Sequence, residues 1–293
     1  MAQLDYTSNV WDTDQISLNY IYPTLEEVSV LINGVTTNPD VSIAVGGSTA
    51  FLYKLDNPTV TEGVAGRALT TAVSGNTKID ILLNRSFQVD EVIPNAVSST
   101  LSVDVVAPYL VNATTRVANE HGKKGLIEMI DGGTSAGAAL GAPSKTTIYG
   151  KIIDEIKAFD EANPERSTGA NYLIVSPATL AFLRQSTEFL QTSATAGLLR
   201  DGIVGQLGGL TVILSKQLST IDGTDVDGYS TLTNVRFVLG AADAFAAPIV
   251  FRNFRVKDSE LYFGVKVQAE LPYGFKVLDA NRIRFYADTA TAA

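Results

Sequence analysis

Cysteine is absent from this 293-residue chain. Its absence excludes disulfide bonds and every metal site that depends on thiolate ligands. The chain also lacks an uninterrupted apolar run of about 18 residues, the length that a membrane-spanning helix needs. The first thirty residues have neither the basic start nor the apolar run of a signal peptide, and they carry five carboxylates. We therefore expect a soluble protein of a reducing compartment, with no membrane partner and with stability that comes from packing and association.

Basic residues are scarce as well. The 22 Lys and Arg residues stand against 31 Asp and Glu residues, so the formal net charge is −9. A protein whose main task is to grip phosphate backbones needs the opposite balance. Sequence-specific DNA binding is therefore disfavoured.

Motifs that carry catalytic chemistry are also lacking. The chain has one histidine, His121, and no Gly-x-Ser-x-Gly sequence, so no nucleophile relay is visible. His121 falls at the end of a predicted helix, where a cation interacts favourably with the terminal carbonyls. We expect a structural role for His121, no catalytic residues and no cofactor.

Two segments resemble ligand-binding loops only in part. The run from Gly132 to Ala142 is rich in glycine, but no Gly-Lys-Ser or Gly-Lys-Thr follows at the spacing of a phosphate-binding loop, so a linker is favoured. Asp222, Asp225 and Asp227 have the spacing of calcium ligands, but the closing Glu of the twelve-residue pattern is missing. A solvated turn is the favoured interpretation, with incidental cation binding as the alternative and no metal site expected.

The most informative stretch runs from Tyr172 to Leu218. Tyr172 to Val175 predicts a short buried strand, followed by Ser176 as an N-cap and Pro177 as the first helical residue. Glycines then punctuate a second strand, Leu210 to Leu214. This order resembles the axial domain of tailed-phage major capsid proteins, those with the Hong Kong 97-type fold, and a looser likeness extends from about Asn38 to the C-terminus.

The resemblance implies an α+β chain in which 45% hydrophobic residues supply a large core. Its parts would be an axial domain, a peripheral domain with a long spine helix, an extended β-hairpin loop and an N-terminal arm. The expected divisions are the arm at 1–40, the extended loop at 41–93, the spine helix and linker of the peripheral domain at 94–143, the axial domain at 144–247, and the C-terminal strands of the peripheral domain at 248–293.

The arm and the loop are the expected subunit contacts. The arm is polar with isolated aromatics, which have little core of their own to enter; an N-terminal strand folded onto its own domain is the alternative. The loop has strand patterns on either side of a glycine-rich middle, a pattern that an ordinary β-meander would also give. In some relatives a lysine of this loop is bonded covalently to an asparagine of a neighbour, and that motif does not map onto this chain. The candidate interface residues are Trp11, Tyr20, Lys54, Glu62, Arg67 and Lys78.

Periodicity predicts the other elements. Apolar residues spaced by three and four favour a helix from Asn95 to Asn119, kinked or restarted at Pro108 and followed by a break at Gly122 and Gly125. A second amphipathic helix is predicted from Thr146 to Ala162. Further expectations are a strand at Arg236 to Leu239, a short helix at Ala241 to Ala246, strands at Ile249 to Val256, Leu261 to Leu271 and Phe275 to Ala287 beneath the spine helix, and a frayed tail at Thr289 to Ala293.

The leading hypothesis is a non-enzymatic major capsid protein that assembles as hexamers and pentamers into an icosahedral head around double-stranded DNA. It would be built in the host cytoplasm and end in the virion. The implied partners are other copies of the chain, a portal protein, a decoration protein, and a separate scaffolding protein, since the chain begins without a long charged helical extension. An encapsulin-like compartment shell and a small-molecule α/β enzyme are the alternatives.

Overall fold

The computed structural model describes residues 31, 35–36, 49–55, 75–94, 106–136, 143–163, 169–186, 203–250, 252–258 and 264–292. Its helices are α4 (Val106–Gly132), α5 (Ile148–Ala162) and α6 (Pro177–Gln185). Its strands are β1 (Thr49–Leu55), β2 (Asn76–Leu82), β3 (Arg85–Pro94), β4 (Thr134–Ser135), β5 (Tyr172–Val175), β6 (Ile203–Leu207), β7 (Leu210–Leu214), β8 (Tyr229–Gly240), β9 (Phe245–Ala246), β10 (Arg252–Asp258), β11 (Gly264–Tyr273), β12 (Lys276–Val277) and β13 (Ile283–Ala292).

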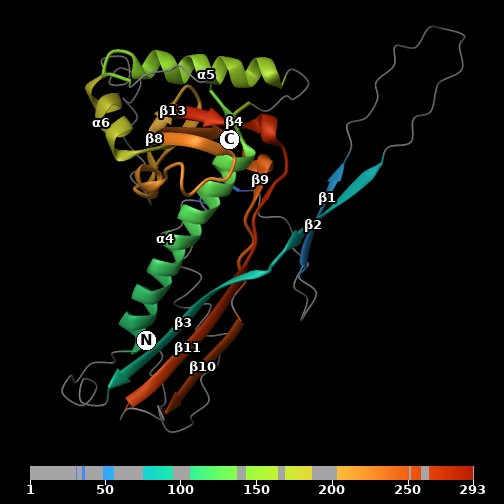
Figure 1. The fold of residues 1–293 in the computed structure, drawn as a ribbon, viewed down its shortest axis with the longest axis vertical. Helices are drawn as coiled ribbons and strands as arrows, with labels where there is room; N and C mark the ends of the chain where they lie inside the picture. Colours follow the sequence, from blue (N-terminus) through green and yellow to red (C-terminus); the bar gives the residue numbers. More distant parts are fainter. Residues whose placement is uncertain are drawn as a thin grey trace, which may run out of the picture.

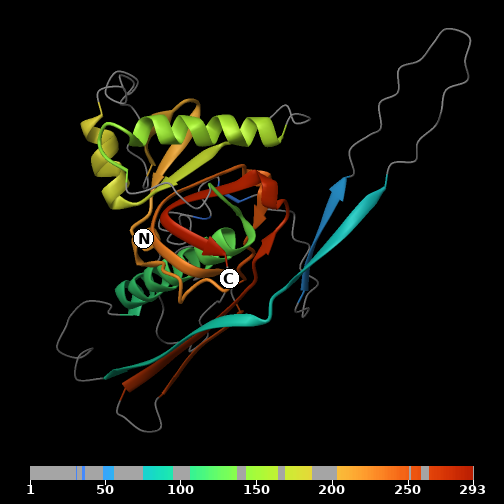
Figure 2. The same cartoon turned by 45° about the horizontal axis from the view of Figure 1, so that its top comes forward.

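The described chain has three visible parts (Figure 1). A six-stranded sheet of order β4-β13-β8-β5-β7-β6 lies with α5 and α6, and a three-stranded sheet of order β10-β11-β3 runs beside α4. The β1–β2 hairpin projects away from both, as the tilted view in Figure 2 also shows. This mixture of helices and mainly antiparallel strands is the α+β fold that the sequence predicts.

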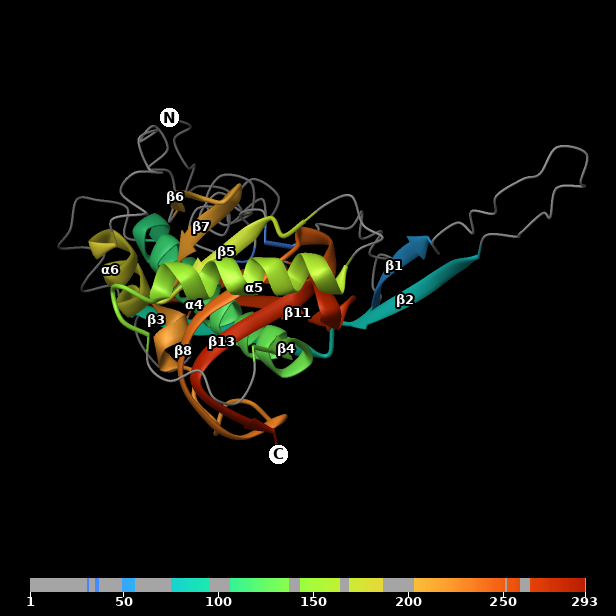
Figure 3. The ribbon, with the colours of Figure 1, turned by 90° about the horizontal axis from the view of Figure 1, so that it is seen from above.

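The six-stranded sheet is covered on both faces at β5, which carries buried apolar side chains in both directions. Leu173 and Val175 pack with α5 and α6, whereas Tyr172 and Ile174 pack with the C-terminal part of α4. Figure 3 shows α5 lying across this sheet. All four β5 residues are buried, so the predicted short buried strand is confirmed.

The turn from β5 into α6 is the one that the sequence predicts. The Thr179 backbone N–H donates to Ser176 Oγ at 3.4 Å, and Pro177 occupies the first helical position. Proline is tolerated there because its missing N–H would have no partner within the helix. The strand at Leu210 to Leu214 is confirmed as β7, which pairs in parallel with β5.

The long helix α4 differs from its prediction at its C-terminal end. It has 27 residues and runs to Gly132, without a break at Gly122 or Gly125. A side chain at Gly125 would collide with Leu31, so this glycine permits close packing rather than ending the helix. Pro108 falls in the first turn, where proline needs no kink. Residues 95–105, the expected start of the helix, lie outside the described residues.

The three-stranded sheet lies along α4 (Figure 1). Here β11 is the central strand, antiparallel to both β10 and β3, and its pairing with β3 extends from Gly264–Pro94 to Tyr273–Arg85. Phe87 on β3 and Tyr273 on β11 stack with ring centroids 4.3 Å apart, facing the helix side chain His121. Aromatic side chains therefore fill the contact between the three-stranded sheet and α4.

The C-terminal strands do not stay together. While β10 and β11 lie beside α4, β13 joins the six-stranded sheet between β4 and β8. The tail predicted to fray is paired as far as Ala292, and Ala290 is only 6% exposed, so that prediction is wrong. The predicted short helix is a 3-10 turn, Ala242–Ala244, followed by β9. The strand predicted at Arg236 to Leu239 is the last part of the longer β8.

Candidate functional site

The single histidine is a core residue. His121 lies in the middle of α4 rather than at a helix end, and its side chain is 0% exposed. The rings of Phe87, Tyr273 and Phe275 surround it, with centroids 5.0 to 6.4 Å away. Neither ring nitrogen has a hydrogen-bond partner among the described residues. Burial lowers the pKa of His121 to about 4, so the imidazole is neutral at physiological pH.

The aspartate-rich loop folds on itself and onto α4. Asp222 Oδ1 accepts hydrogen bonds from the Thr224 backbone N–H at 2.9 Å and from the Thr224 hydroxyl at 2.6 Å. These bonds lower the pKa of Asp222. Asp225 forms an ion pair with Lys123 of α4 at 3.3 Å, so the loop is attached to the helix. Within the described ranges, no three potential metal-ligating side chains gather in one place.

The start of the glycine-rich run has a packing explanation. A side chain on Gly133 would lie 2.5 Å from the Met129 carbonyl oxygen, and one on Gly132 would lie 2.7 Å from a methyl carbon of Val277. Directly afterwards, β4 pairs in parallel with β13. These glycines thus allow α4 to end against the sheet. Residues 137–142, the rest of the run, lie outside the described residues.

Two of the six candidate interface residues, Lys54 and Lys78, belong to the described part of the chain. Trp11, Tyr20, Glu62 and Arg67 lie outside the described residues. Lys54 belongs to β1, where its backbone is opposite Thr77. Lys78 is opposite Tyr53 on the neighbouring strand, so the register places the two lysine positions on opposite faces of the hairpin and does not bring them together.

The side chain of Lys78 lies at the hairpin surface. Its Nζ is 3.0 Å from Asp80 and 4.9 Å from the centre of the Phe51 ring. Both members of this ion pair are about half exposed, at 50% and 54%. Such a pair contributes little to stability in water. Its role at a subunit interface remains a prediction.

The hairpin carries apolar residues on both of its faces. The register places Leu52 opposite Ile79 and Ala50 opposite Ile81 on one face, with Thr49 opposite Leu82 on the other. The first face is buried at the hairpin base, where Ala50 and Ile81 contact Ala246. On the second face Leu82 is 59% exposed. The sequence predicts the strands, but not which face is open, since that depends on where the base attaches.

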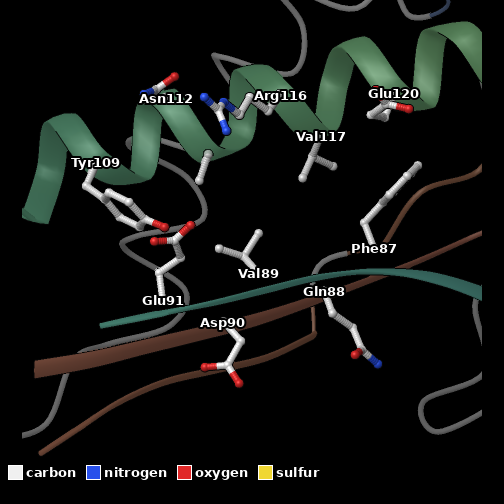
Figure 4. A pocket seen from close by; sticks show the side chains of 11 residues that line it. Phe87, Gln88, Val89, Asp90, Glu91, Tyr109, Asn112, Arg116, Val117 and Glu120 are labelled. Carbon is white, nitrogen blue, oxygen red and sulfur yellow. The ribbon is translucent and has the colours of Figure 1, made fainter. Parts of the chain in front are cut away.

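A groove of about 470 Å³ lies between α4 and β3. Figure 4 shows the side chains of Phe87, Val89 and Glu91 directed from the strand toward the helix, while the alternate residues point away. Tyr109 meets Glu91 at one end of the groove. Burial, together with the charge and hydrogen bond of Glu91, raises the pKa of Tyr109 to about 12.

The sequence interpretation missed this groove. It ended the helix at Asn119, one residue before the groove-lining Glu120. The apolar alternation of Phe87 and Val89 signals a one-sided strand, but the element that this face meets depends on the tertiary fold.

The lengths and hydropathy of the described helices can be compared with those of a membrane-spanning helix. None of them combines the length and the apolar character required for a bilayer span.

Comparisons with known proteins give a likeness at the level of structure. No family model matches the chain, and no curated protein matches it. A solved structure from Mycobacterium phage Che8 is 19% identical, with a TM-score of 0.60 over 87% of this chain and 89% of that one. The capsid structure of the cyanophage P-SCSP1u is 12% identical, with a TM-score of 0.60 over 98% and 93%.

The capsid of the Myoviridae phage XM1 is 11% identical, with a TM-score of 0.59 over 89% of this chain and 91% of that one. In these structures the likeness covers 87% to 98% of this chain and 89% to 93% of the other chain. The chain has the Hong Kong 97-like fold of tailed-phage major capsid proteins.

Proposed function

We propose that this protein is a major capsid protein, a structural subunit that closes an icosahedral shell around double-stranded DNA and that is not an enzyme. The observation that carries the proposal is the structural likeness to phage capsids across almost the full length of both chains. The parts of the shell would be hexamers and pentamers of this chain. Residues 144–247 would form the axial domain, with the arm at 1–40, the loop at 41–93 and the peripheral domain at 94–143 and 248–293, except that β13 lies in the six-stranded sheet of the axial domain.

The hairpin gives physical support for assembly. It is a two-stranded sheet, and no further described strand pairs with either of its outer edges. Two-stranded hairpins are marginal on their own in water, and unpaired edges are templates for association. Leu82 adds an exposed apolar side chain at the open face. A neighbouring copy that covers this face would bury both the apolar surface and the strand edges.

The negative net charge of the chain is compatible with a shell subunit that encloses DNA without binding it tightly. A net charge of −9 disfavours tight contact with phosphates, so DNA would be confined by the shell and not recognised by sequence. Assembly would take place in the host cytoplasm with a scaffolding protein and a portal protein, and a decoration protein would bind outside. The finished protein would reside in the virion.

Light scattering and negative-stain electron microscopy of the full-length protein test this proposal. Concentrated protein, alone or coexpressed with its scaffolding protein, should form closed shells or rings of five and six subunits. A protein that stays strictly monomeric under both conditions would contradict the proposal.

A further inference from the structure

The groove between α4 and β3 follows an open edge of the three-stranded sheet. In the order β10-β11-β3, β3 pairs with β11 on one side and with no described strand on the other. Residues 87–91 of β3 all line the groove, although Figure 4 shows the side chains of Gln88 and Asp90 pointing away from the helix. The backbone of β3 therefore forms part of the groove wall. Alternate residues of such an edge strand direct both N–H and C=O outward, so an extended segment can pair with them.

The inner surface of the groove is apolar. It is formed by Phe87 and Val89 of β3 with Ala113 and Val117 of α4, and both β3 side chains are only half-buried. Every second side chain of a strand points the same way, so an added strand would direct alternate side chains toward this surface. The occupant should therefore carry an apolar side chain in the middle of the groove.

Carboxylates stand at both ends of the groove. Figure 4 shows Glu91 at one end and Glu120 at the other, and both residues are exposed. Asp90, the third acidic residue of the lining, is already paired with Lys266 at 3.1 Å. Glu91 and Glu120 are therefore the two negative charges that an occupant would meet.

Basic side chains do not neutralise these two carboxylates. Within the described ranges, neither Glu91 nor Glu120 has a lysine or arginine nitrogen within 4.0 Å. Arg116 is the one basic residue of the lining, and Lys124 is held over two stacked aromatic rings of the sheet instead. The lining therefore carries more negative than positive charge, which complements a cationic occupant.

The spacing of the carboxylates defines the pattern of the occupant. Glu120 lies at the Phe87 end of the groove, so its separation from Glu91 is close to the length of strand from Phe87 to Glu91. That length is about 13 Å, at about 3.3 Å per residue. In an extended segment, residues four positions apart have this same spacing and point to the same face. The matching occupant has two basic residues four positions apart, with an apolar residue midway between them.

This chain does not contain such a segment. None of its 22 lysine and arginine residues stands four positions before another. A second copy of the chain therefore lacks the pattern as well, and the segment must belong to a different polypeptide.

We propose that the groove between α4 and β3 binds an extended segment of a separate protein, which pairs with the open edge of β3. In this segment a basic residue, an apolar residue and a second basic residue alternate with other residues. The two basic side chains contact Glu91 and Glu120, and the apolar side chain lies against Val89. The proposal does not depend on the function proposed above, because it concerns one subunit and its ligand.

Fluorescence anisotropy of the full-length protein tests this proposal, with the fluorescein-labelled peptide Ser-Lys-Thr-Val-Thr-Lys-Ser as the probe. The control peptide Ser-Lys-Thr-Val-Lys-Thr-Ser has the same composition and charge, but its two lysines point to opposite faces of a strand. The probe should bind at least several-fold more tightly than the control. Equal affinities would overturn the proposal, because they would reflect only general attraction to an acidic protein. Absence of probe binding would overturn it too.

Charge variants of the protein locate the bound probe. Glu91→Gln and Glu120→Gln should each weaken probe binding several-fold, and high salt should reduce both losses because the attraction is between charges. Asp154→Asn, which removes an exposed carboxylate from α5, is the matched control and should leave binding unchanged. Equal losses in all three variants would show that the probe does not occupy the groove.

Filling the groove gives an independent measurement. Ala113→Arg should abolish binding of the probe, because the longer side chain occupies the space of its apolar residue. Ala158→Arg, the same substitution at a similarly half-buried alanine of α5, should bind the probe normally. Equal binding by these two variants would contradict the placement.

Hydrogen exchange of the β3 amides distinguishes the proposed ligand from other occupants. In dilute protein without the probe, alternate amides of β3 should exchange rapidly, and saturating probe should slow them several-fold. If these amides are already protected without the probe, the edge is occupied by this chain or by a second copy, and the proposal is overturned.

Discussion

The six-stranded sheet and the β1–β2 hairpin differ in how much of their apolar surface is buried within the subunit. In the sheet, β5 lies between β7 and β8, both of its faces are covered, and all four of its residues are buried. In the hairpin, two strands pair only with each other among the described residues, and Leu82 is exposed. The sheet encloses its central strand within one subunit, whereas both strands of the hairpin are edge strands and one of its faces is open, the features of an element that we expect a partner to cover.

The largest effect should come from the sheet. Phe237 on β8 is fully buried and stacks on Tyr286 of β13 with ring centroids 5.1 Å apart. Phe237→Ala should lower the free energy of unfolding by about 3–5 kcal/mol because it leaves a cavity. Leu82→Ala should change it by less than about 0.5 kcal/mol. Urea denaturation of both variants measures the difference, and similar losses would contradict the contrast between the two regions.

The stability of the contact between α4 and the three-stranded sheet should depend on pH. The pKa of His121 is about 4 in the folded protein, against 6.5 for an ordinary histidine. The unfolded chain therefore binds more protons between these values, and stability should fall as the pH drops from 6.5 to 4, by about 3 kcal/mol in all. His121→Leu should remove this part of the pH dependence. Parallel stability curves for wild type and variant across this window would show that His121 does not titrate as we describe.

The contribution of ion pairs to stability should also differ between the sheet region and the hairpin. Glu155 and Arg284 join α5 to β13 at 2.9 Å, and their side chains are only 11% and 15% exposed. Arg284→Ala should cost about 3 kcal/mol because it leaves a shielded carboxylate without its partner, and adding Glu155→Gln should recover part of the loss. The exposed hairpin pair offers the matched comparison, since Lys78→Ala should cost at most about 1 kcal/mol. Thermal melting ranks the three variants.

A charge on the open face of the hairpin should have the smallest effect on the stability of the subunit and the largest effect on its assembly. Leu82→Asp places a charge on the open face of the hairpin, so it should weaken assembly at least several-fold while leaving the melting temperature nearly unchanged. Ile153→Asp, at another exposed apolar residue on α5, is the control and should assemble normally. Light scattering of both variants measures assembly, and equal losses would remove the special role of the hairpin.

Local signals explain what could be predicted from the sequence. Ser176 and Pro177 mark a helix start through their own chemistry, and alternation marks β1, β2 and β3 without reference to the rest of the chain. The end of α4 could not be predicted in this way. Gly125 resembles a helix breaker until Leu31 is seen to need its space.

The same limit applies to residues that depend on distant partners. Glu155 lies on the buried face of α5 with Ile152 and Phe159, and its partner there is Arg284, 129 positions later, which the helix pattern alone does not identify. The tail up to Ala292 looks unstructured by composition, yet β8 provides a strand for it to pair with. The groove likewise arises only when β3 is laid against α4.

Hydrogen exchange compares the two regions directly in free and assembled protein. Our account predicts that backbone amides of β1 and β2 exchange at least about tenfold more slowly after assembly, whereas those of β5, already enclosed within the subunit, do not change. Unchanged exchange in β1 and β2 within a purified shell would contradict the claim that a neighbouring subunit completes the hairpin.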